Sequence, residues 1–375
     1  MAEIVKVYRM CARCVMDTTA LDISFDENGV CNYCTDFLNL LKNRLHFDEV
    51  QNQGLLERIL NKIKENGKEK EYDCIIGLSG GLDSSFVLYN AKKFGLRPLA
   101  VHLDNGWNSE LASSNIERLV KSLNVDLYTH VINWEEFKDL QIAFFKAHVV
   151  DIELLTDHAI TAILYKIAHE RQIRYLVSGT NVASEGMRIP PSWAHLKIDF
   201  KNIKAIYKGF GNGKRLETFP IIGLVKYVKY TLLDKIKWLS ILDFMPYKKD
   251  EAIQILIKET GWRPYEKKHY ESIFTRFYQG YILPKKFNID KRKLHYSTLI
   301  CSGQMSREKA LELLKMSTYD NQLLLKEDEE YVLKKLGFSP KEFEEYLNSP
   351  PVPHNYYPSS EWSYNKLAIL YNKFG

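Results

Sequence analysis

The sequence lacks any run of about 18 uncharged apolar residues, the length that a helix needs to cross a bilayer. Its first six residues, Met1-Ala-Glu-Ile-Val-Lys6, also lack the apolar centre of a signal peptide. We therefore expect a cytoplasmic protein with no membrane partner. Internal repeats and low-complexity tracts are absent too, which excludes a repeat architecture. The formal net charge is only +5, which suits an anionic small molecule such as a nucleotide and does not require nucleic acid.

A glycine-rich turn follows the apolar run at residues 74–78, but the Gly-Lys-Ser/Thr of a Walker loop is missing. A strand, a glycine turn and a helix together direct unpaired backbone N–H groups and the positive helix end at a phosphate. Two adjacent glycines let the backbone approach a ligand, and three serines add hydroxyl donors. Asp83 is an anion, so we expect it either to cap the helix or to bind the Mg²⁺ that neutralises phosphates. The whole turn reads Leu78-Ser79-Gly80-Gly81-Leu82-Asp83-Ser84-Ser85.

This turn resembles the Ser-Gly-Gly-x-Asp-Ser loop of the ATP pyrophosphatase, or PP-loop, superfamily. The resemblance implies an enzyme that splits ATP between the α and β phosphates. Such an enzyme adenylates a carbonyl or carboxyl oxygen, and a nucleophile then displaces AMP. It also implies that Asp83 and Ser84 are catalytic. The implied ATP- and pyrophosphate-binding residues are Leu78, Ser79, Gly80, Gly81, Asp83, Ser84 and Ser85.

Four of the six cysteines form two Cys-x-x-Cys pairs, Cys11/Cys14 and Cys31/Cys34, with sixteen residues between the pairs. In a cytoplasmic protein this spacing favours a structural Zn²⁺ site with four thiolates over disulfides. A redox dithiol and an iron–sulfur cluster are the alternatives. The acidic residues around the pairs argue against a nucleic-acid-binding finger. The other two cysteines, Cys74 and Cys301, have no partner by spacing.

Strands and helices alternate after residue 73, which predicts an α/β fold with a doubly wound parallel sheet and helices on both faces. The predicted strands are 74–78, 98–103, 127–132 and 175–178, and the predicted helices between them are 83–94, 109–123, 135–147 and 157–170. Apolar spacing over 224–239 predicts a further helix. We divide the chain into a zinc ribbon (1–45), a helical connector (46–70), the α/β domain (71–235) and a mostly helical C-terminal region (236–375).

Polar clusters follow three of these strands, at the sheet edge where ligands of such folds bind. One is the glycine turn. The second, His102-Leu-Asp104-Asn105-Gly-Trp107-Asn108, follows the second strand, and Gly179-Thr180-Asn181 follows the fourth. The superfamily resemblance implies that His102 and Asp104 border the adenosine and that Gly179, Thr180 and Asn181 line its far side. Asp104, a third candidate catalytic residue, either holds ribose or a metal or caps the helix near Ser109.

Further candidates for substrate contacts lie outside these clusters or beside them. His158 begins a predicted helix and either faces the site or packs in the core. Arg188 and Lys197 either bind substrate or pyrophosphate, or are solvated surface cations. Asn105 and Trp107 complete the set of candidate substrate residues.

The order of these motifs resembles the N-acetyl sugar amidotransferase family of bacterial surface-polysaccharide, O-antigen and nonulosonic-acid pathways. The resemblance includes both cysteine pairs, the glycine turn and the clusters after the second and fourth strands. It also includes Trp262-Arg-Pro-Tyr265 and His269-Tyr-Glu271. It implies that an acetamido group of a lipopolysaccharide or nonulosonic-acid precursor sugar is converted to an acetamidino group, with ATP and Mg²⁺. The ammonia would come from a glutaminase of the histidine-biosynthesis type, often with a cyclase-like barrel subunit.

The main alternative is a PP-loop enzyme that thiolates or aminates tRNA, since such enzymes also carry zinc ribbons. Thiolases usually place reactive cysteines within the catalytic domain, and here Cys74 precedes the loop with no second cysteine near it. The modest net charge also argues against an RNA-binding stripe. A non-enzymatic ATP-binding subunit is the third possibility, and the intact loop argues against it.

Overall fold

The computed structural model describes residues 7–44, 49–265, 270–319 and 321–374. Its centre is a sheet of five parallel strands in the order β3-β2-β1-β4-β5. Because the order reverses between β1 and β4, the turns after these two strands leave the sheet in different directions and open a crevice at its carboxyl edge. The α/β prediction is confirmed. The strands are β1 (Cys74–Gly77), β2 (Pro98–Asp104), β3 (Leu127–Val131), β4 (Tyr175–Ser178) and β5 (Lys237–Ser240).

Side chains of the strands alternate between two apolar cores, one on each face of the sheet. Ile75 packs in the core that contains residues of α5 and α6, whereas Ile76 packs in the core that contains residues of α2, α3 and α10. Successive residues of a strand point to opposite faces, so the near-continuous apolar run of β1 is what a sheet covered on both sides requires.

The first group of helices lies before, between or directly after the strands in the sequence and ends at Thr260. They are α1 (Asn32–Arg44), α2 (Glu49–Gly67), α3 (Leu82–Lys93), α4 (Glu110–Leu123), α5 (Trp134–Lys146), α6 (Leu154–Glu170), α7 (Val182–Glu185), α8 (Phe200–Phe210), α9 (Leu224–Val228), the π-helix η1 (Lys229–Leu233), the 3₁₀-helix η2 (Ile241–Phe244) and α10 (Lys249–Thr260).

The region that follows is helical within its described part, as predicted. Its elements are α11 (Ile273–Phe277), the π-helix η3 (Tyr278–Ile282), α12 (Leu283–Phe287), α13 (Lys291–Cys301), α14 (Arg307–Lys315), α15 (Gln322–Leu336), α16 (Pro340–Asn348), the 3₁₀-helix η4 (His354–Tyr356) and α17 (Glu361–Phe374).

The predicted helix over 224–239 is wrong in its second half. The helix ends in η1, and residues 237–240 form β5, which pairs with β4 and extends the sheet past residue 235. Tyr227, Tyr230 and Leu233 fit a helical period, and a strand of only four residues is too short to break that period visibly. Its position at the edge of the sheet also leaves Trp238 41% exposed. β5 therefore lacks the burial on both faces that marks the inner strands.

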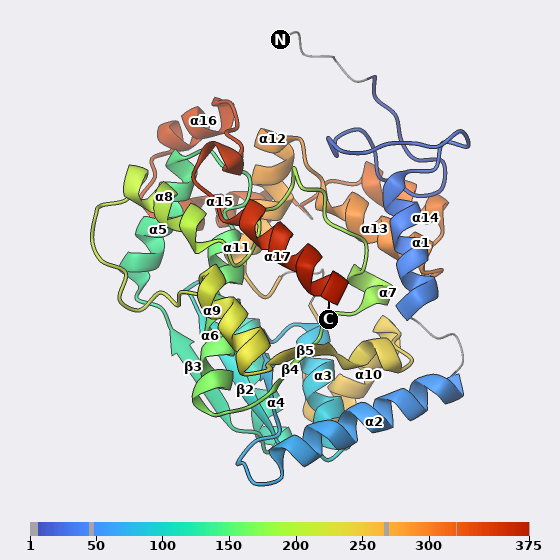
Figure 1. Cartoon of the computed structure of the whole chain (residues 1–375). Coiled ribbons are helices and arrows are strands. Elements are labelled where there is room, and N and C mark those ends of the chain that lie inside the picture. The colour runs from blue at the N-terminus through green and yellow to red at the C-terminus, as the bar shows by residue number, and fades with distance from the viewer. Residues whose placement is uncertain (1–6, 45–48, 266–269, 320, 375) are drawn as a thin grey trace.

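The C-terminal helices lie over the carboxyl edge of the sheet (Figure 1). The loop after β2 holds one end of this cover: Trp107 packs on Phe274 with ring centroids 5.2 Å apart, and Asn108 forms a β-bridge with Ser272. At the other end, α13 packs on α7, where Gln304 Nε2 donates to the Ala183 carbonyl over 2.9 Å. The crevice at the carboxyl edge is therefore enclosed by two parts of the chain.

A buried polar network joins the last segment of the chain to the sheet domain. The rings of His354 and His195 stack with centroids 4.5 Å apart. His354 Nδ1 hydrogen-bonds Asn202 Oδ1 over 2.8 Å, and His195 Nε2 lies 2.9 Å from Asp199 Oδ2. Asp199 also accepts bonds from the backbone of Ser360. Satisfied polar networks of this kind fix how two segments meet.

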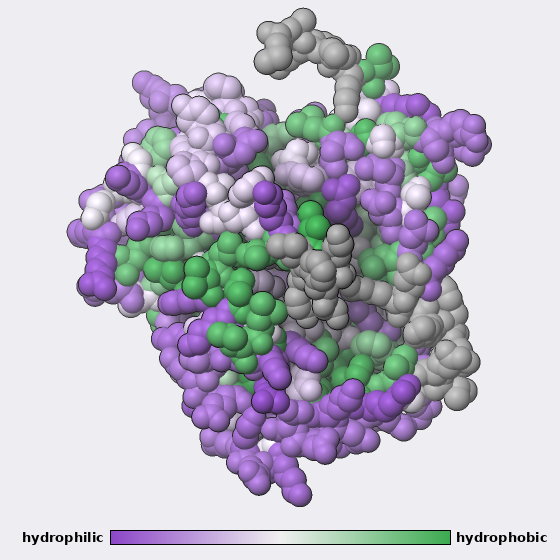
Figure 2. All heavy atoms as spheres, in the orientation of Figure 1, coloured by the Kyte–Doolittle hydropathy of each residue, from purple (hydrophilic) through white to green (hydrophobic). Residues whose placement is uncertain are grey.

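An exposed apolar patch lies over α9 and η1 (Figure 2). It contains Val225, Leu232 and Leu233, and Val225 and Leu233 are 84% and 74% exposed. These side chains therefore pack little against the described part of the chain. Within that part, no helix combines the length and apolarity needed to span a bilayer.

We predict that the protein loses stability as the pH falls below about 6.5, the usual histidine pKa. Burial lowers the pKa of His158 to about 4 and that of His354 to about 3. Between these values and 6.5 the unfolded chain binds protons that the folded chain does not, so each histidine costs up to about 1.4 kcal/mol of stability per pH unit. Urea unfolding at several pH values between about 7 and about 5 measures this slope.

The variant His354→Gln should show a shallower pH slope. His295→Gln, which alters a partly buried histidine on α13, is the matched control and should keep the slope of the wild type. An unchanged slope in His354→Gln would contradict the prediction.

Candidate active site

The turn between β1 and α3 is a compact, self-bonded loop. Ser79 N and Ser79 Oγ lie 3.3 Å and 3.2 Å from Ser84 Oγ, and Gly81 N donates to Ser79 Oγ over 3.3 Å. These bonds are long compared with the usual 2.9–3.0 Å, so phosphate oxygens can readily replace them. Ser79 is exposed at the mouth of the loop and Leu78 is buried beneath it.

Ser85 holds the helix rather than the loop mouth. It is fully buried, and its hydroxyl donates to the Gly81 carbonyl over 2.6 Å. The prediction that Asp83 caps the helix is wrong, because α3 begins at Leu82 and Gly81 takes the N-cap position without a side-chain cap. Asp83 lies instead within the first turn, close to the positive end of the helix.

Gly179 lets the β4 turn pack directly on the first turn of α3. A Cβ atom at this position would lie 2.6 Å from the Asp83 carbonyl carbon and 2.7 Å from Ser84 N, closer than real contacts allow. The two turns that flank the crevice are thus in backbone contact. Gly179 is required by this close approach rather than by an unusual backbone angle.

Gly80 adopts a φ of +80°, which side-chain-bearing residues rarely adopt. A Cβ here would also lie 2.7 Å from the Ala112 carbonyl of α4. The carbonyl oxygen of Gly80 accepts two hydrogen bonds, from Trp262 Nε1 over 2.9 Å and from Tyr265 Oη over 3.1 Å. The motif Trp262-Arg-Pro-Tyr265 therefore contacts the loop itself. His269, from the neighbouring motif, lies outside the described residues.

Three oxygen-bearing side chains gather around the start of α3. The hydroxyl of Tyr247 donates to Asp83 Oδ1. Burial and then the charge of Asp83 raise the pKa of Tyr247 well above its usual value, and the charge of Glu185 adds to this effect. Glu185, at the end of α7, therefore lies near Tyr247. Carboxylate oxygens are the ligands that Mg²⁺ prefers, so Asp83 could hold this ion.

His102 links the second polar cluster to the loop. Its Nδ1 lies 2.8 Å from the Leu78 carbonyl, and its Nε2 lies 3.0 Å from Asn108 Nδ2. Nε2 must accept from the amide, so Nδ1 carries the proton. Burial lowers the pKa of His102, which keeps the ring neutral. His102 therefore fixes the distance between the ends of β1 and β2.

The remaining residues of the second cluster shape the loop after β2. Asp104 Oδ1 accepts from Gly106 N over 2.8 Å, while Ser109 caps α4 by accepting from Ala112 N. The idea that Asp104 caps this helix is thus wrong. Asn105 bonds Thr156 over 3.0 Å. Trp107 is buried and donates to Gln141 over 2.8 Å, so it packs in the core beneath the site.

The third cluster offers hydroxyl and amide groups at the end of β4. Thr180 Oγ1 lies 3.0 Å from both Ser178 Oγ and Ser240 Oγ, and Thr180 is exposed. Asn181 caps α7 through its Oδ1, and its buried Nδ2 has no hydrogen-bond partner among the described residues. An unpaired buried donor is costly, so this amide is suited to a bound ligand.

Three predicted substrate residues lie away from the loop. His158 is fully buried, with Nδ1 on the Lys197 carbonyl and Nε2 on Ile222 N, so the packed alternative is correct. Arg188 pairs with Asp22, 3.2 Å away, beside the cysteine pairs. Lys197 lies between Asp151 and Asp157, at 2.7 and 3.0 Å. Burial lowers its pKa, but these carboxylates outweigh that effect and raise the pKa above its usual range.

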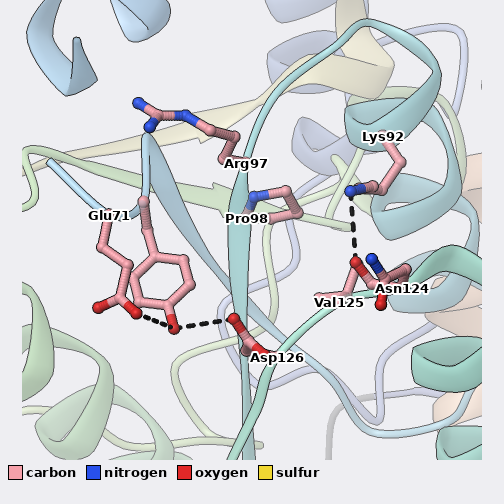
Figure 3. Close-up of a pocket in the computed structure, with 8 residues that line it drawn as sticks. Glu71, Lys92, Arg97, Pro98, Asn124, Val125 and Asp126 are labelled. Atoms are coloured by element: carbon pink, nitrogen blue, oxygen red, sulfur yellow. Dashed lines mark hydrogen bonds between the residues drawn. The ribbon is translucent and has the colours of Figure 1, made fainter.

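A surface hollow of about 200 Å³ lies at the opposite, amino edge of the sheet (Figure 3). Its walls come from the starts of β2 and β3 and the ends of α3 and α4. Within it, the Tyr72 hydroxyl bonds Asp126 over 3.0 Å, and Lys92 bonds the Asn124 carbonyl. The strands of this fold present their ligand-binding turns at the carboxyl edge, so this hollow is not part of the candidate site.

The four predicted cysteines form one buried cluster. Their sulfur atoms all lie within 4.8 Å of one another, with Cys11 and Cys34 3.9 Å apart and Cys14 and Cys31 3.8 Å apart. A tetrahedral Zn²⁺ with Zn–S bonds of about 2.3 Å requires sulfurs about 3.8 Å apart. Backbone N–H groups of Cys14 and Cys31 point at Cys11 Sγ, which suits a thiolate. These residues fit zinc.

The cluster also holds the C-terminal helices. Arg307 donates to the carbonyls of Cys14 and Cys11 over 3.1 and 3.0 Å, and Ser297 accepts from Val15 N. Cys301, for which spacing suggested no partner, lies with its Sγ 3.5 Å from Cys34 Sγ. The ribbon thus fixes α13 and α14, and α13 in turn packs on α7.

Two protein families match different parts of the chain. Residues 52–216, which contain β1–β4 and the glycine turn, match the family NAD synthase. Residues 271–372 match the family described as "LPS biosynthesis protein WbpG-like, C-terminal domain". The chain thus combines an NAD synthase-like (PP-loop) domain with a WbpG-like C-terminal domain. The glycine turn is therefore its PP-loop, and the helical cover over the carboxyl edge is its WbpG-like domain.

Single related proteins match part of the chain or match it at low identity. "Uncharacterized protein MJ1599" of Methanocaldococcus jannaschii is 34% identical over 119 residues, which are 31% of this chain and 40% of that protein. The chain thus spans less than half of that relative. An NMN synthetase structure from Francisella tularensis is 18% identical, with a TM-score of 0.30 over 57% of this chain and 88% of the other.

A second solved structure shows a similarly low likeness. It is the NH3-dependent NAD synthetase from Campylobacter jejuni subsp. jejuni in complex with the nitrate ion. It is 16% identical, with a TM-score of 0.29 over 58% of this chain and 99% of the other. The identification of the PP-loop domain rests on the family match and the sheet order.

Sequence reasoning missed several residues around the PP-loop. Tyr247 reaches Asp83 from a distant segment and Glu185 lies near Tyr247, so no local spacing reveals them. Glu271, the first residue of the WbpG-like match, places Oε1 3.2 Å from where a Cβ on Gly81 would lie. Trp262 and Tyr265 were noted as a motif, but their contact with Gly80 was not foreseen.

We predict that Gly179→Ala weakens ATP binding strongly. The added methyl group would press on the backbone of Asp83 and Ser84, and such overpacking costs about 1–3 kcal/mol. The loop must move to relieve it. Gly209→Ala, at a position where a Cβ meets no atom within 4 Å, is the control. Calorimetric titration with Mg²⁺-ATP measures the loss, and equal affinity in the two variants would contradict the prediction.

We predict that the purified chain carries one Zn²⁺ and that Cys11→Ser loses it, because three thiolates bind Zn²⁺ less tightly than four. Elemental analysis measures the metal. Cys74→Ser, which alters a cysteine buried in β1, should keep it. The Cys11→Ser variant should also unfold at lower temperature, because Arg307 and Ser297 would lose a fixed partner. A metal-free wild type of full stability would contradict this prediction.

Proposed function

We propose that this protein is an ATP-dependent amidotransferase that converts an acetamido group of a bacterial surface sugar into an acetamidino group. The observation that carries the proposal is the position of the WbpG-like domain, which covers the carboxyl edge where the PP-loop opens. The NAD synthase match supports an ATP-using amidation, and the match to a family of LPS biosynthesis proteins supports a lipopolysaccharide sugar as the substrate.

The first step activates the amide oxygen. The acetamido oxygen attacks the α phosphorus of ATP, the bond from this phosphorus to the bridging oxygen breaks, and pyrophosphate leaves. Ser79, Ser84 and the first turn of α3 would hold the departing pyrophosphate. Asp83 would hold Mg²⁺, which when bound offsets the charge on the phosphates. The amide nitrogen loses its proton to solvent, so the product is a neutral O-adenylyl imidate whose leaving group is AMP.

The second step forms the new carbon–nitrogen bond. Ammonia attacks the imidate carbon, the carbon–oxygen bond to AMP breaks, and a protonated acetamidino group remains. The groups at the end of β4, Thr180 and the unpaired amide of Asn181, are placed on the side of the crevice opposite His102 and Asp104. We assign the nucleotide to the space between them.

We further propose that the ammonia comes from a separate glutaminase of the histidine-biosynthesis type, with a cyclase-like barrel subunit as a further partner. Neither remaining cysteine suits glutamine hydrolysis in this chain. Cys74 is buried in β1, where burial raises its thiol pKa, and Cys301 lies against Cys34. ATP, ammonia and a nucleotide-linked sugar are available together in the cytoplasm, where we expect the enzyme to act.

The test is AMP release with ATP, Mg²⁺ and ammonium chloride across a panel of nucleotide-linked acetamido sugars. Turnover should need both ammonia and one of these sugars, and mass spectrometry should show oxygen replaced by NH. Adding the glutaminase and glutamine should replace free ammonium. AMP release that depends on tRNA instead of a sugar would contradict the proposal and favour the tRNA-modifying alternative.

We predict that Asp83→Asn lowers AMP release by about 100-fold or more while the fold is kept, because the phosphates lose a partner for their cation. Circular dichroism checks the fold. Glu117→Gln, which neutralises an exposed carboxylate on α4, is the matched control and should keep full activity. Turnover retained by Asp83→Asn would contradict the assigned site.

A further inference from the structure

We infer that Trp262 and Tyr265 are positioning residues that hold the PP-loop in its phosphate-binding conformation. We call these two side chains the Gly80 clamp. The inference rests on the proposed use of the loop for ATP, and it assigns to the clamp a part in binding the departing pyrophosphate.

The clamp supplies two hydrogen-bond donors to one backbone oxygen, that of Gly80. A carbonyl oxygen has two lone pairs, and that of Gly80 accepts from Trp262 Nε1 at 2.9 Å and from Tyr265 Oη at 3.1 Å. Trp262 is 2% exposed and Gly80 is buried. Both donors therefore act where water competes little, which strengthens the bonds.

Fixing this oxygen also fixes the N–H group on the other side of the same peptide. The peptide unit is planar and trans, so the Gly80 carbonyl and the Gly81 N–H point in opposite directions. Gly81 N points toward Ser79 Oγ, 3.3 Å away, which itself lies 3.2 Å from Ser84 Oγ. The N–H group and two hydroxyls thus form one donor set at the exposed mouth of the loop.

Without the clamp this peptide is free to rotate. It lies between Gly80 and Gly81, and glycines on both sides leave the backbone angles little restricted. The same flexibility that admits a φ of +80° at Gly80 would let the Gly81 N–H turn away from the mouth. The clamp removes that freedom before a ligand arrives, which is preorganisation.

The clamp is itself held firmly to α4. Asn115 binds both backbone groups of Arg263, which lies between the two donors in the sequence. Asn115 Nδ2 donates to the Arg263 carbonyl and Asn115 Oδ1 accepts from Arg263 N, each over 2.8 Å. The rings of Trp262 and Tyr265 also pack edge to face, with centroids 5.8 Å apart. A rigid support of this kind is what a positioning device requires.

The clamp belongs to neither family match. Those matches cover residues 52–216 and 271–372, and the clamp lies between them, just before the WbpG-like domain begins. Glu271, the first residue of that domain, approaches Gly81 on the same loop. Described residues on both sides of the start of that domain therefore contact the PP-loop.

The test compares Trp262→Phe, Tyr265→Phe and the double variant with the wild type. Tyr265→Phe removes only the hydroxyl donor, whereas Trp262→Phe removes the indole N–H together with part of the ring. Affinity for Mg²⁺-pyrophosphate is measured by calorimetry, and KM for ATP and kcat by AMP release. Each single change should weaken pyrophosphate binding about three- to tenfold, as the loss of one hydrogen bond predicts. The double variant should lose more than the product of the single effects, because the buried carbonyl is then unsatisfied.

Control variants and thermal unfolding separate positioning from mere packing. Trp238→Phe and Tyr128→Phe alter partly exposed aromatic residues on β5 and β3 and should bind pyrophosphate like the wild type. The clamp variants should lose most of the rise in melting temperature that pyrophosphate causes. Tyr265 is only half-buried, so Tyr265→Phe keeps the test decisive if Trp262→Phe does not fold.

The clamp would be overturned if Tyr265→Phe and the double variant both fold and bind pyrophosphate with unchanged affinity. A lower melting temperature alone would then indicate that these side chains only pack. A folded double variant whose loss of affinity is no greater than the product of the two single effects would overturn it too. A wild type that neither binds pyrophosphate nor releases AMP would overturn the proposed function, and the clamp with it. These outcomes are distinguishable because the wild type is measured first.

Discussion

The peptide between Gly80 and Gly81 is the point on which the candidate site depends. On one side α4 leaves no space for a side chain at Gly80, and on the other Trp262 and Tyr265 hold its carbonyl oxygen. The loop must expose N–H groups to bind phosphate, so its carbonyl groups need partners elsewhere. Segments far away in the chain supply those partners. The PP-loop is therefore formed by tertiary contacts as much as by its own glycines.

The same principle extends to the whole carboxyl edge. Gly179 allows the turn after β4 to rest on the backbone of α3, and His102 connects the end of β2 to Leu78. The WbpG-like domain then spans from Trp107 on one side to α7 on the other. The cysteine cluster fixes the far end of this cover through Arg307. A cysteine cluster that fits zinc thus helps to hold the cover in place over the candidate site.

Local patterns sufficed for much of the fold. β4 was predicted with its observed bounds, and the other predicted strands and the helices between them differ by at most three residues at either end. The prediction failed at β5, because four residues next to a helical period carry too little signal. It also failed to choose among single residues. His158 looked as suitable as His102, yet one is packed between Phe200 and Phe219 while the other borders the loop. Burial depends on neighbours from other segments, which no local spacing encodes.

The sequence by itself determined the chemistry of the two local motifs. Four cysteines in two close pairs can meet at one metal ion, and Ser-Gly-Gly-x-Asp-Ser after a strand exposes donors to a phosphate, because in each case the needed groups lie within a few residues of one another. Only the tertiary structure decided what surrounds them. Four side chains reach these motifs from segments more than 160 residues away: Trp262, Tyr265, Tyr247 and Cys301. Such contacts follow from how helices pack on a sheet, a property of the whole chain rather than of any one stretch.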